Sequence, residues 1–235
     1  LVGQNGCGKT TLAKHFNGLH APTQGSVQVL GKSTSDWTLP ELGRRVGYVF
    51  QNPDHQIFAN TVLDEVAFGP RNYGLPEENI REAVRRALSV TGLENREHED
   101  PFNLTRGERQ QLAVASVLAT DPDILVLDEP TTGLDYHGQI IMLDLIRRLN
   151  DSGKTVIMIT HSMWVVAEYA ERCIIMSQGK IVKDGNVRSC FQNPDLLESL
   201  YLEAPEAVRI GYEFGLVVRS VTEITACLEL RKNHN

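Results

Sequence analysis

The chain has 235 residues, 41% of them hydrophobic, and a formal net charge of −7 at pH 7. This length allows one large domain, or a domain with a small appendage. The acidic balance argues against a general nucleic-acid-binding protein. No apolar run approaches the roughly 18 residues that are needed to span a bilayer.

The chain opens with a phosphate-binding pattern. In "LVGQNGCGKTTL", Gly3, Gly8, Lys9 and Thr10 fit G-x-x-x-x-G-K-(S/T). The backbone amides of such a loop surround phosphate oxygens, and the helix that follows adds favourable potential. The lysine supplies positive charge to the β- and γ-phosphates, and the threonine hydroxyl ligates Mg²⁺. Taken alone, the pattern also fits a glycine-rich turn before a helix.

The predicted elements alternate in type along the chain. Helices are expected over residues 9–18, 76–91, 106–119 and 137–150. Strands are expected over residues 26–30, 46–50, 123–129 and 155–161, with two later strands at "CIIMS" and "KIVKDG". The apolar run "DILVLDE" is typical of a buried parallel strand. This alternation predicts an α/β fold in which crossover helices connect parallel strands.

The pattern changes after about residue 185. Pro194 and Pro205 each open a short helix, and "SVTE" is a capping box for a last helix that begins at Ser220. We therefore expect an α/β domain over residues 1–185, with a helical subdomain over about 52–120, and a helical extension over 186–235.

Two acids follow the buried strand. Asp128 is suited to a Mg²⁺ site, and Glu129 is suited to orienting and polarising an attacking water. His161 ends the next strand, where an imidazole can contact a γ-phosphate. Acids or a histidine at a strand end often have no such role. The carboxyl ends of parallel strands meet at one edge of a sheet, so these residues are expected near the phosphate loop.

The stretch "LTRGERQQ" has two competing interpretations. Thr105 and Glu108 form a T-x-x-E capping box for the helix that follows. The same helix N-terminus is also a candidate anion site. Both cannot be fully true at once if the Thr105 hydroxyl is committed to the backbone amide of Glu108.

Taken together in their order along the chain, the sequence motifs resemble those of the ATP-binding-cassette (ABC) ATPases. "GQNGCGKTT" looks like the Walker A loop, "LTRGERQ" like the LSGGQ signature, and "ILVLDE" like Walker B with the catalytic glutamate. Gln51 resembles the Q-loop glutamine, Asp135 in "TTGLD" the D-loop aspartate, and His161 the switch histidine. The resemblance covers residues 1 to about 185 and implies a P-loop NTPase core with a mainly parallel sheet and an inserted helical subdomain.

The resemblance also implies the ligands and the residues that bind them. The ligands would be ATP and Mg²⁺. ATP would contact Gly3, Asn5, Gly6, Cys7, Gly8, Lys9, Thr10, Thr11, Thr105, Gly107 and Asp135. The catalytic residues would be Glu129, His161 and Gln51. The metal would be held by Thr10, Gln51 and Asp128.

The signature departs from the family pattern. Arg106 stands where a glycine is usual, and Glu108 stands where a glutamine is usual. A site that uses this signature is therefore a candidate for reduced activity.

A narrower resemblance follows Gln51. "FQNPDHQIFANTVLDEVAFGPRNYGL" and the tail "APEAVRIGYEFGLVVRSVTE" are similar to the ATPases of energy-coupling-factor importers, which take up vitamins and transition-metal ions. This implies a second ATPase, identical or different, a transmembrane coupling subunit and a small substrate-binding membrane subunit, with no nucleic acid. The protein would lie on the cytoplasmic face of the cell membrane as a peripheral subunit. Asp64 and Glu65 are expected to meet basic residues of the membrane subunit.

The N-terminus departs from the family fold, which places strands and an adenine-stacking aromatic residue before the Walker A loop. Only Leu1 and Val2 precede the loop here, so the chain is expected to be an N-terminally truncated fragment.

Two alternatives remain. A soluble cassette protein of DNA repair, translation or iron–sulfur assembly is disfavoured because the chain has neither a long coiled coil nor a basic linker. A P-loop kinase or GTPase leaves "LTRGERQ", "TTGLD" and His161 unexplained. The sequence does not indicate the transported substrate.

Overall fold

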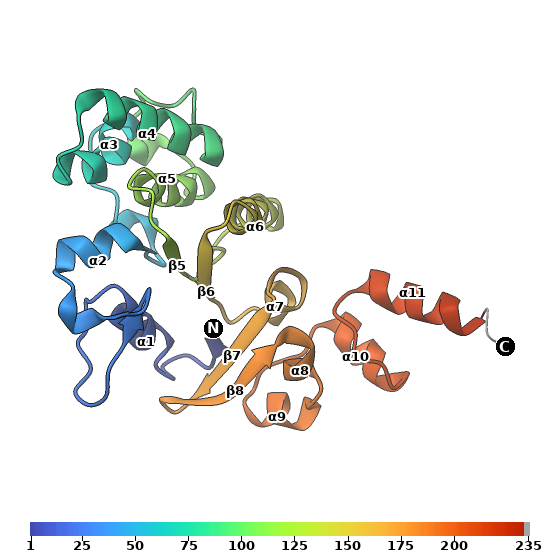
Figure 1. Ribbon diagram of the computed structural model, residues 1–235. Helices are drawn as coiled ribbons and strands as arrows, with labels where there is room; N and C mark the ends of the chain where they lie inside the picture. Colours follow the sequence, from blue (N-terminus) through green and yellow to red (C-terminus); the bar gives the residue numbers. More distant parts are fainter. Residues whose placement is uncertain (233–235) are drawn as a thin grey trace. The chain divides into compact units, whose positions relative to one another are not determined.

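The computed structural model describes residues 1–232, which form two compact units (Figure 1). The terminal unit comprises Leu1–Lys9 and Thr160–Asn235, and the central unit comprises Thr10–Ile159. The predicted domain boundary at about residue 185 stays a prediction.

A parallel three-stranded sheet forms the centre of the central unit, in the order β4 (Val46–Val49), β5 (Ile124–Asp128), β6 (Thr155–Ile159). The middle strand, β5, is the apolar run that ends in two acids, and four of its five residues are buried. A strand with neighbours on both edges and cover on both faces favours such continuous apolar sequence. The expected parallel arrangement of strands is present, because β5 pairs in parallel with both β4 and β6.

Helices surround this sheet. The central unit contains α1 (Lys9–Phe16, which begins in the terminal unit), α2 (Leu39–Arg45), α3 (Val62–Asn72), α4 (Glu77–Thr91), α5 (Arg106–Leu118) and α6 (Tyr136–Asp151). Three of these, α3, α4 and α5, pack on one another, while α5 also packs on β4 and α6 on β6. As expected, α4 ends at Gly92, whose φ of +78° is the left-handed conformation that glycine adopts readily.

Shorter elements complete the central unit. They are the hairpin β2 (Gln28–Val29) and β3 (Lys32–Ser33), and the 3₁₀ turns η1 (Thr34–Asp36), η2 (Pro53–His55) and η3 (Pro101–Asn103). Helix α2 was not expected from the sequence. It begins at a capping box in which the Thr38 side chain accepts from the Glu41 amide and the Glu41 carboxylate accepts from the Thr38 amide.

The terminal unit is built around a second sheet. β1 (Val2–Gly3) pairs in parallel with β7 (Arg172–Ser177), which pairs antiparallel with β8 (Lys180–Asn186). The helices are α7 (Met163–Tyr169), α8 (Val187–Phe191), α9 (Pro194–Ser199), α10 (Glu206–Glu213) and α11 (Val221–Lys232). Val2, Phe191 and Val208 share one buried apolar cluster, so β1 packs in the same core as the C-terminal helices.

The expected capping box of α11 is only half formed. The Glu223 amide donates to the Ser220 hydroxyl, but the Glu223 carboxylate accepts from the Arg219 amide instead of the Ser220 amide. The Glu223 carboxylate also pairs with Arg188, 2.8 Å away, which ties α11 to α8.

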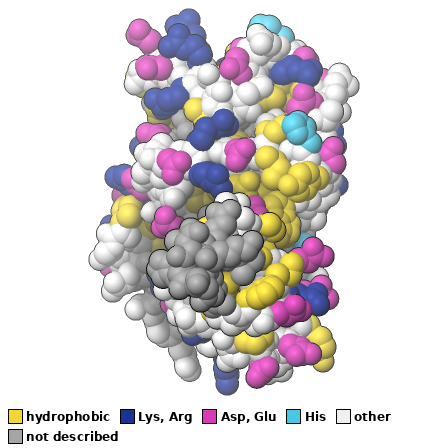
Figure 2. Space-filling view, turned by 90° about the vertical axis from the view of Figure 1, so that its right-hand side faces the viewer, with side chains coloured by type: hydrophobic (Ala, Val, Ile, Leu, Met, Phe, Trp, Pro, Cys, Tyr) yellow, Lys and Arg dark blue, Asp and Glu magenta, His cyan; other side chains and the backbone are white. Residues whose placement is uncertain are grey.

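The surface carries mixed charge. On the face that Figure 2 presents, acidic and basic side chains are interspersed and do not gather into one patch of a single sign. None of the helices over residues 1–232 combines the length and apolar character that a membrane crossing requires.

Candidate active site

Sheet register brings Gln51 and Glu129 together. Val49 of β4 lies opposite Leu127 of β5. Gln51 and Glu129 lie two residues after these positions, so they reach the same level at the ends of the two neighbouring strands. The Gln51 Nε2 donates to Glu129 Oε2 at 3.0 Å. The predicted Q-loop glutamine and the predicted catalytic glutamate therefore meet at the carboxyl edge of the sheet.

The backbone at Glu129 turns sharply away from β5. Its φ is +49°, a left-handed conformation that few residues other than glycine adopt. The Glu129 amide donates to Ile159 O at 2.9 Å, which fixes this turn against the end of β6. The Thr132 hydroxyl donates to Glu129 Oε2 at 2.9 Å. One carboxylate oxygen of Glu129 is thus held by an amide and a hydroxyl.

Asp128 has a different set of partners. The Thr10 hydroxyl donates to Asp128 Oδ2 at 2.9 Å, and the Tyr48 hydroxyl donates to the same oxygen at 2.8 Å. Burial, followed by the hydrogen bond to Asp128, raises the pKa of Tyr48 above its ordinary value of 10.0. Tyr48 therefore stays a protonated donor that fixes the aspartate.

Tyr48 and Thr132 were not among the residues expected at the site from the sequence. A tyrosine within the otherwise apolar strand "VGYV" is a usable signal, because a buried phenol needs a hydrogen-bond partner. The strand next to it supplies that partner. Thr132 lies three residues after Glu129 in a turn, and no sequence pattern distinguishes its hydroxyl from that of Thr131.

The predicted metal ligands present oxygen atoms. Thr10 and Asp128 meet through their side-chain oxygens, and oxygen donors are what Mg²⁺ prefers. Over the described residues, no group of three or more His, Cys, Asp and Glu side chains is placed to hold a metal. A site made of one hydroxyl, one carboxylate and one amide oxygen fits a metal that shares its coordination with substrate phosphates and water.

The signature segment forms the N-terminus of α5. The Thr105 hydroxyl accepts from the Glu108 amide at 3.3 Å and donates to Glu108 Oε2 at 2.8 Å. Arg96 also donates to Glu108 Oε1 at 2.7 Å. The hydrogen bonds from Thr105, ahead of the charge of Arg96, hold the pKa of Glu108 below its ordinary value of 4.5.

These contacts show the capping interpretation of this segment, and the anion site stays a prediction. The Thr105 hydroxyl is committed to the capping box. The Glu108 charge, which would repel a phosphate, is paired with Arg96. An anion could still bind the backbone amides of the first turn of α5, because the first amides of a helix have no intrahelical acceptor. Gly107 lies there with open space beside its Cα.

Asp135 caps α6. Its carboxylate accepts from the Gly138 amide at 2.8 Å. The predicted D-loop aspartate therefore has a structural role in this chain, whichever ligand it also contacts.

The phosphate loop begins in the terminal unit. At Gly3, φ is +151° and an added Cβ would lie 2.2 Å from the carbonyl oxygen of Met176, so only glycine fits. Lys9 is buried, and its Nζ donates to Gly3 O at 2.8 Å and Gln4 O at 2.9 Å. The Cys7 carbonyl accepts from the Gly179 amide at 3.0 Å. The loop is thus closed by its own lysine and anchored to the β7–β8 turn.

The other Walker A positions lie along this loop and the start of α1. Asn5, Gly6 and Thr11 are exposed, Gly8 and Thr10 are half-buried, and Cys7 is buried. This leaves the tip of the loop open to a ligand.

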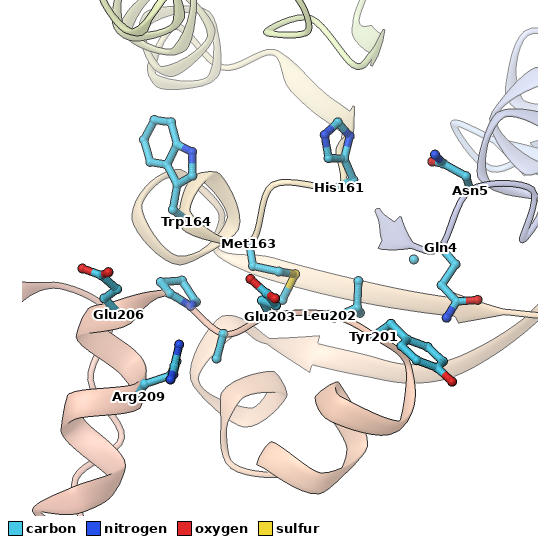
Figure 3. A pocket seen from close by; sticks show the side chains of 13 residues that line it. Gln4, Asn5, His161, Met163, Trp164, Tyr201, Leu202, Glu203, Glu206 and Arg209 are labelled. Atoms are coloured by element: carbon cyan, nitrogen blue, oxygen red, sulfur yellow. The ribbon is translucent and has the colours of Figure 1, made fainter.

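His161 lies beside the phosphate loop within the terminal unit. It lines a pocket of about 720 Å³ together with Gln4 and Asn5 of the loop, Trp164 of α7 and the segment that joins α9 to α10. Figure 3 shows His161 and Asn5 along one side of this pocket, with Glu203, Leu202 and Tyr201 across from them. The Gln4 side chain donates to Leu200 O at 3.1 Å, which ties the loop to the end of α9.

The structure changes one expectation about a partner contact. Glu65 is 2% exposed, and its Oε2 accepts from the backbone amides of Phe58 and Ala59 at 3.0 and 2.9 Å. It holds a loop of its own chain, so the expectation that it meets a basic partner residue is wrong. Asp64 is exposed and pairs with Arg71 at 2.9 Å.

Comparisons with known proteins show which family the chain resembles. The ABC transporter family model matches residues 1–132. The ATP-binding protein EcfA of an energy-coupling factor transporter from Methanocaldococcus jannaschii is 42% identical over 212 residues, which are 89% of this chain and 76% of the relative.

Another relative, from Caldanaerobacter subterraneus subsp. tengcongensis, is named provisionally as an ABC transporter ATP-binding protein. It is 54% identical over 97% of this chain, which spans only 40% of the length of that relative.

A solved structure is also similar. It is cbiO1 from Clostridium perfringens, described as part of the ABC transporter complex cbiONQ. The match has a TM-score of 0.77 and 33% identity, and it covers 92% of this chain and 86% of the other. The expected α/β fold of P-loop type is thereby confirmed. The chain therefore belongs to the ABC transporter family and carries its ATPase domain.

Proposed function

We propose that the chain is the ATP-binding and ATP-hydrolysing part of an energy-coupling-factor importer that takes up a vitamin or a transition-metal ion. Two comparisons support this subfamily, the M. jannaschii EcfA protein and cbiO1, which belongs to a transporter complex. The observation that carries the hydrolytic role is the geometry at Glu129, whose Oε2 accepts from both Gln51 and Thr132.

Glu129 would act as the general base. A water oxygen attacks the γ-phosphorus, the bond from that phosphorus to the β–γ bridging oxygen breaks, and ADP leaves. The proton of the water passes to the Glu129 carboxylate, and from there to solvent. The two donors on Oε2, Gln51 and Thr132, hold the carboxylate in one orientation, as a general base requires.

The neighbouring residues would bind the triphosphate. Lys9 would leave the Gly3 and Gln4 carbonyls for the β- and γ-phosphates, and the loop amides would surround the phosphate oxygens. Thr10, Asp128 and Gln51 would hold Mg²⁺, which neutralises developing phosphate charge. His161 would contact the γ-phosphate.

The signature would serve a second ATPase, identical or different. Two cassettes would close head to tail over two ATP molecules, with the first turn of α5, including Thr105 and Gly107, directed at the triphosphate of the facing subunit. Asp135 would lie in the same contact. ATP would thus hold the two subunits together, and hydrolysis would release them.

The remaining partners would be membrane proteins. We propose a transmembrane coupling subunit and a small membrane subunit that selects the substrate, with this protein bound to them at the cytoplasmic face. The relatives that support the subfamily are named as parts of transporters.

The test is a purification of the full native protein from membranes. The protein is tagged, extracted in mild detergent, and its companions are identified by mass spectrometry. We expect a large transmembrane protein, a small hydrophobic one and an ATPase. Recovery without any membrane protein, in an otherwise active ATPase, would contradict the importer and favour a soluble cassette protein.

A further inference from the structure

Arg106, at the first position of α5, is directed at a loop of its own chain. Its Nη2 donates to Thr132 O at 3.4 Å, and its guanidinium lies against Gly133. A Cβ at Gly133 would lie 2.6 Å from Arg106 Cζ, and Gly133 has a φ of +76°. Two separate features therefore suit this contact: a carbonyl that accepts a hydrogen bond, and a glycine that leaves room for a flat cation.

The loop that Arg106 contacts also holds Glu129. Thr132 presents its carbonyl to Arg106 and its hydroxyl to Glu129 Oε2, at 2.9 Å. The contacts therefore connect Arg106 of α5, through Thr132, to the carboxylate of Glu129. All three residues lie in the central unit.

We propose that Arg106 is a positioning residue, which fixes the Thr132–Gly133 turn and through it the orientation of Glu129. This proposal rests on the role of Glu129 as general base. It also links the two sites of a cassette pair, because the signature helix serves the facing ATP while Glu129 serves the ATP of its own subunit.

The obvious alternative is that Arg106 binds a phosphate directly, because it lies at a helix N-terminus where anions are favoured. The geometry points elsewhere, since the guanidinium packs against Gly133. Glu108 does not compete for Arg106 either, because its carboxylate is paired with Arg96 at 2.7 Å. The two roles differ in a measurable way: a phosphate ligand changes ATP binding, whereas a positioning residue changes turnover.

The experiment compares Arg106→Ala, Arg106→Lys and wild type in the complete purified protein with its companions. For Arg106→Ala we expect kcat to fall about 10-fold and KM for ATP to stay within about 2-fold, because only the alignment of the base is lost. Lysine keeps a donor for Thr132 O but not the flat guanidinium, so Arg106→Lys should recover part of kcat. Arg81→Ala, at an exposed arginine of α4, is the matched control and should match wild type.

A second measurement separates the two roles. In the Glu129→Gln background, where we expect hydrolysis to be slowed strongly, Arg106→Ala should leave ATP-dependent association of the ATPase subunits unchanged. Loss of that association would overturn the proposal in favour of a phosphate ligand. Wild-type kcat in Arg106→Ala would overturn it outright.

The failure of this proposal is distinguishable from failure of the proposed function. If Glu129→Gln alone keeps wild-type turnover, the general base is misassigned. If Glu129→Gln loses turnover while Arg106→Ala does not, only the positioning role of Arg106 is wrong. Thermal melting of the Arg106 variants should show an intact fold, as expected for an exposed side chain at a helix start.

Discussion

Asp128 and Glu129 are adjacent in the chain, but their side chains have different partners. Asp128 Oδ2 accepts from the hydroxyls of Thr10 and Tyr48, whereas Glu129 Oε2 accepts from Gln51 and Thr132. The difference arises because φ of Glu129 is +49°, which turns the chain at the end of β5. The neighbouring carboxylates thus have separate surroundings, which fits the two roles proposed for them, Asp128 at a metal and Glu129 at a water.

Tyr48→Phe tests the hydroxyl that fixes Asp128. Removing it leaves the aspartate with one donor fewer, and a hydrogen bond to a charged group contributes about 1.5–3 kcal/mol. We expect the Mg²⁺ concentration for half-maximal ATP hydrolysis to rise several-fold, with the rate restored at saturating Mg²⁺. Tyr73→Phe is the control, because the Tyr73 ring packs against Arg44 in the same unit. An unchanged Mg²⁺ requirement in Tyr48→Phe would show that Tyr48 has no part in holding the metal site.

At the scale of elements, loops and helix starts are held by carboxylates that bind backbone amides. Glu108 does this at the start of α5, and Glu65 on α3 does it for the loop at Phe58 and Ala59. The T-x-x-E pattern predicts the first contact because its partners are close in sequence. The second depends on a loop that folds back, so the sequence alone suggested a surface acid.

Glu65→Ala is expected to destabilise the protein. It leaves the amides of Phe58 and Ala59 without their acceptor, and the loss of bonds to a buried charged group costs about 2–4 kcal/mol. Asp64→Ala is the control on the same helix, where an exposed ion pair contributes about 1 kcal/mol or less. Chemical denaturation of both variants measures the difference. Equal free energies of unfolding would refute the structural role assigned to Glu65.

At the scale of the whole molecule, the predicted motifs are shared between two units. The terminal unit holds most of the phosphate loop and His161, and the central unit holds Glu129, Gln51 and the signature. The sequence predicted the helices α1, α4, α5 and α6 and the main strands, because apolar runs and capping patterns are local, but it missed α2, α3, α7 and α8. The parallel sheet was expected, but the register that places Gln51 beside Glu129 was seen only in the structure.

Other features could be recognised only in the structure. Tyr48, Thr132 and the stacking of Arg106 on Gly133 depend on side chains from distant segments, so no local pattern reveals them. The pairing of β1 with β7 joins residues 2–3 to residues 175–176, and the sequence did not predict it either. Burial of Glu65 contradicts the partner contact that was expected for it from the sequence.

The most direct test of the account is ATP hydrolysis by Glu129→Gln in the complete protein, with Glu82→Gln, an exposed glutamate of α4, as the matched control. If Glu129 is the general base, turnover should fall by about 10²–10⁴-fold while ATP binding is kept. Glu82→Gln should behave like wild type. Turnover of Glu129→Gln within a few-fold of wild type would contradict the account, because the carboxylate held by Gln51 and Thr132 would then have no part in the chemistry.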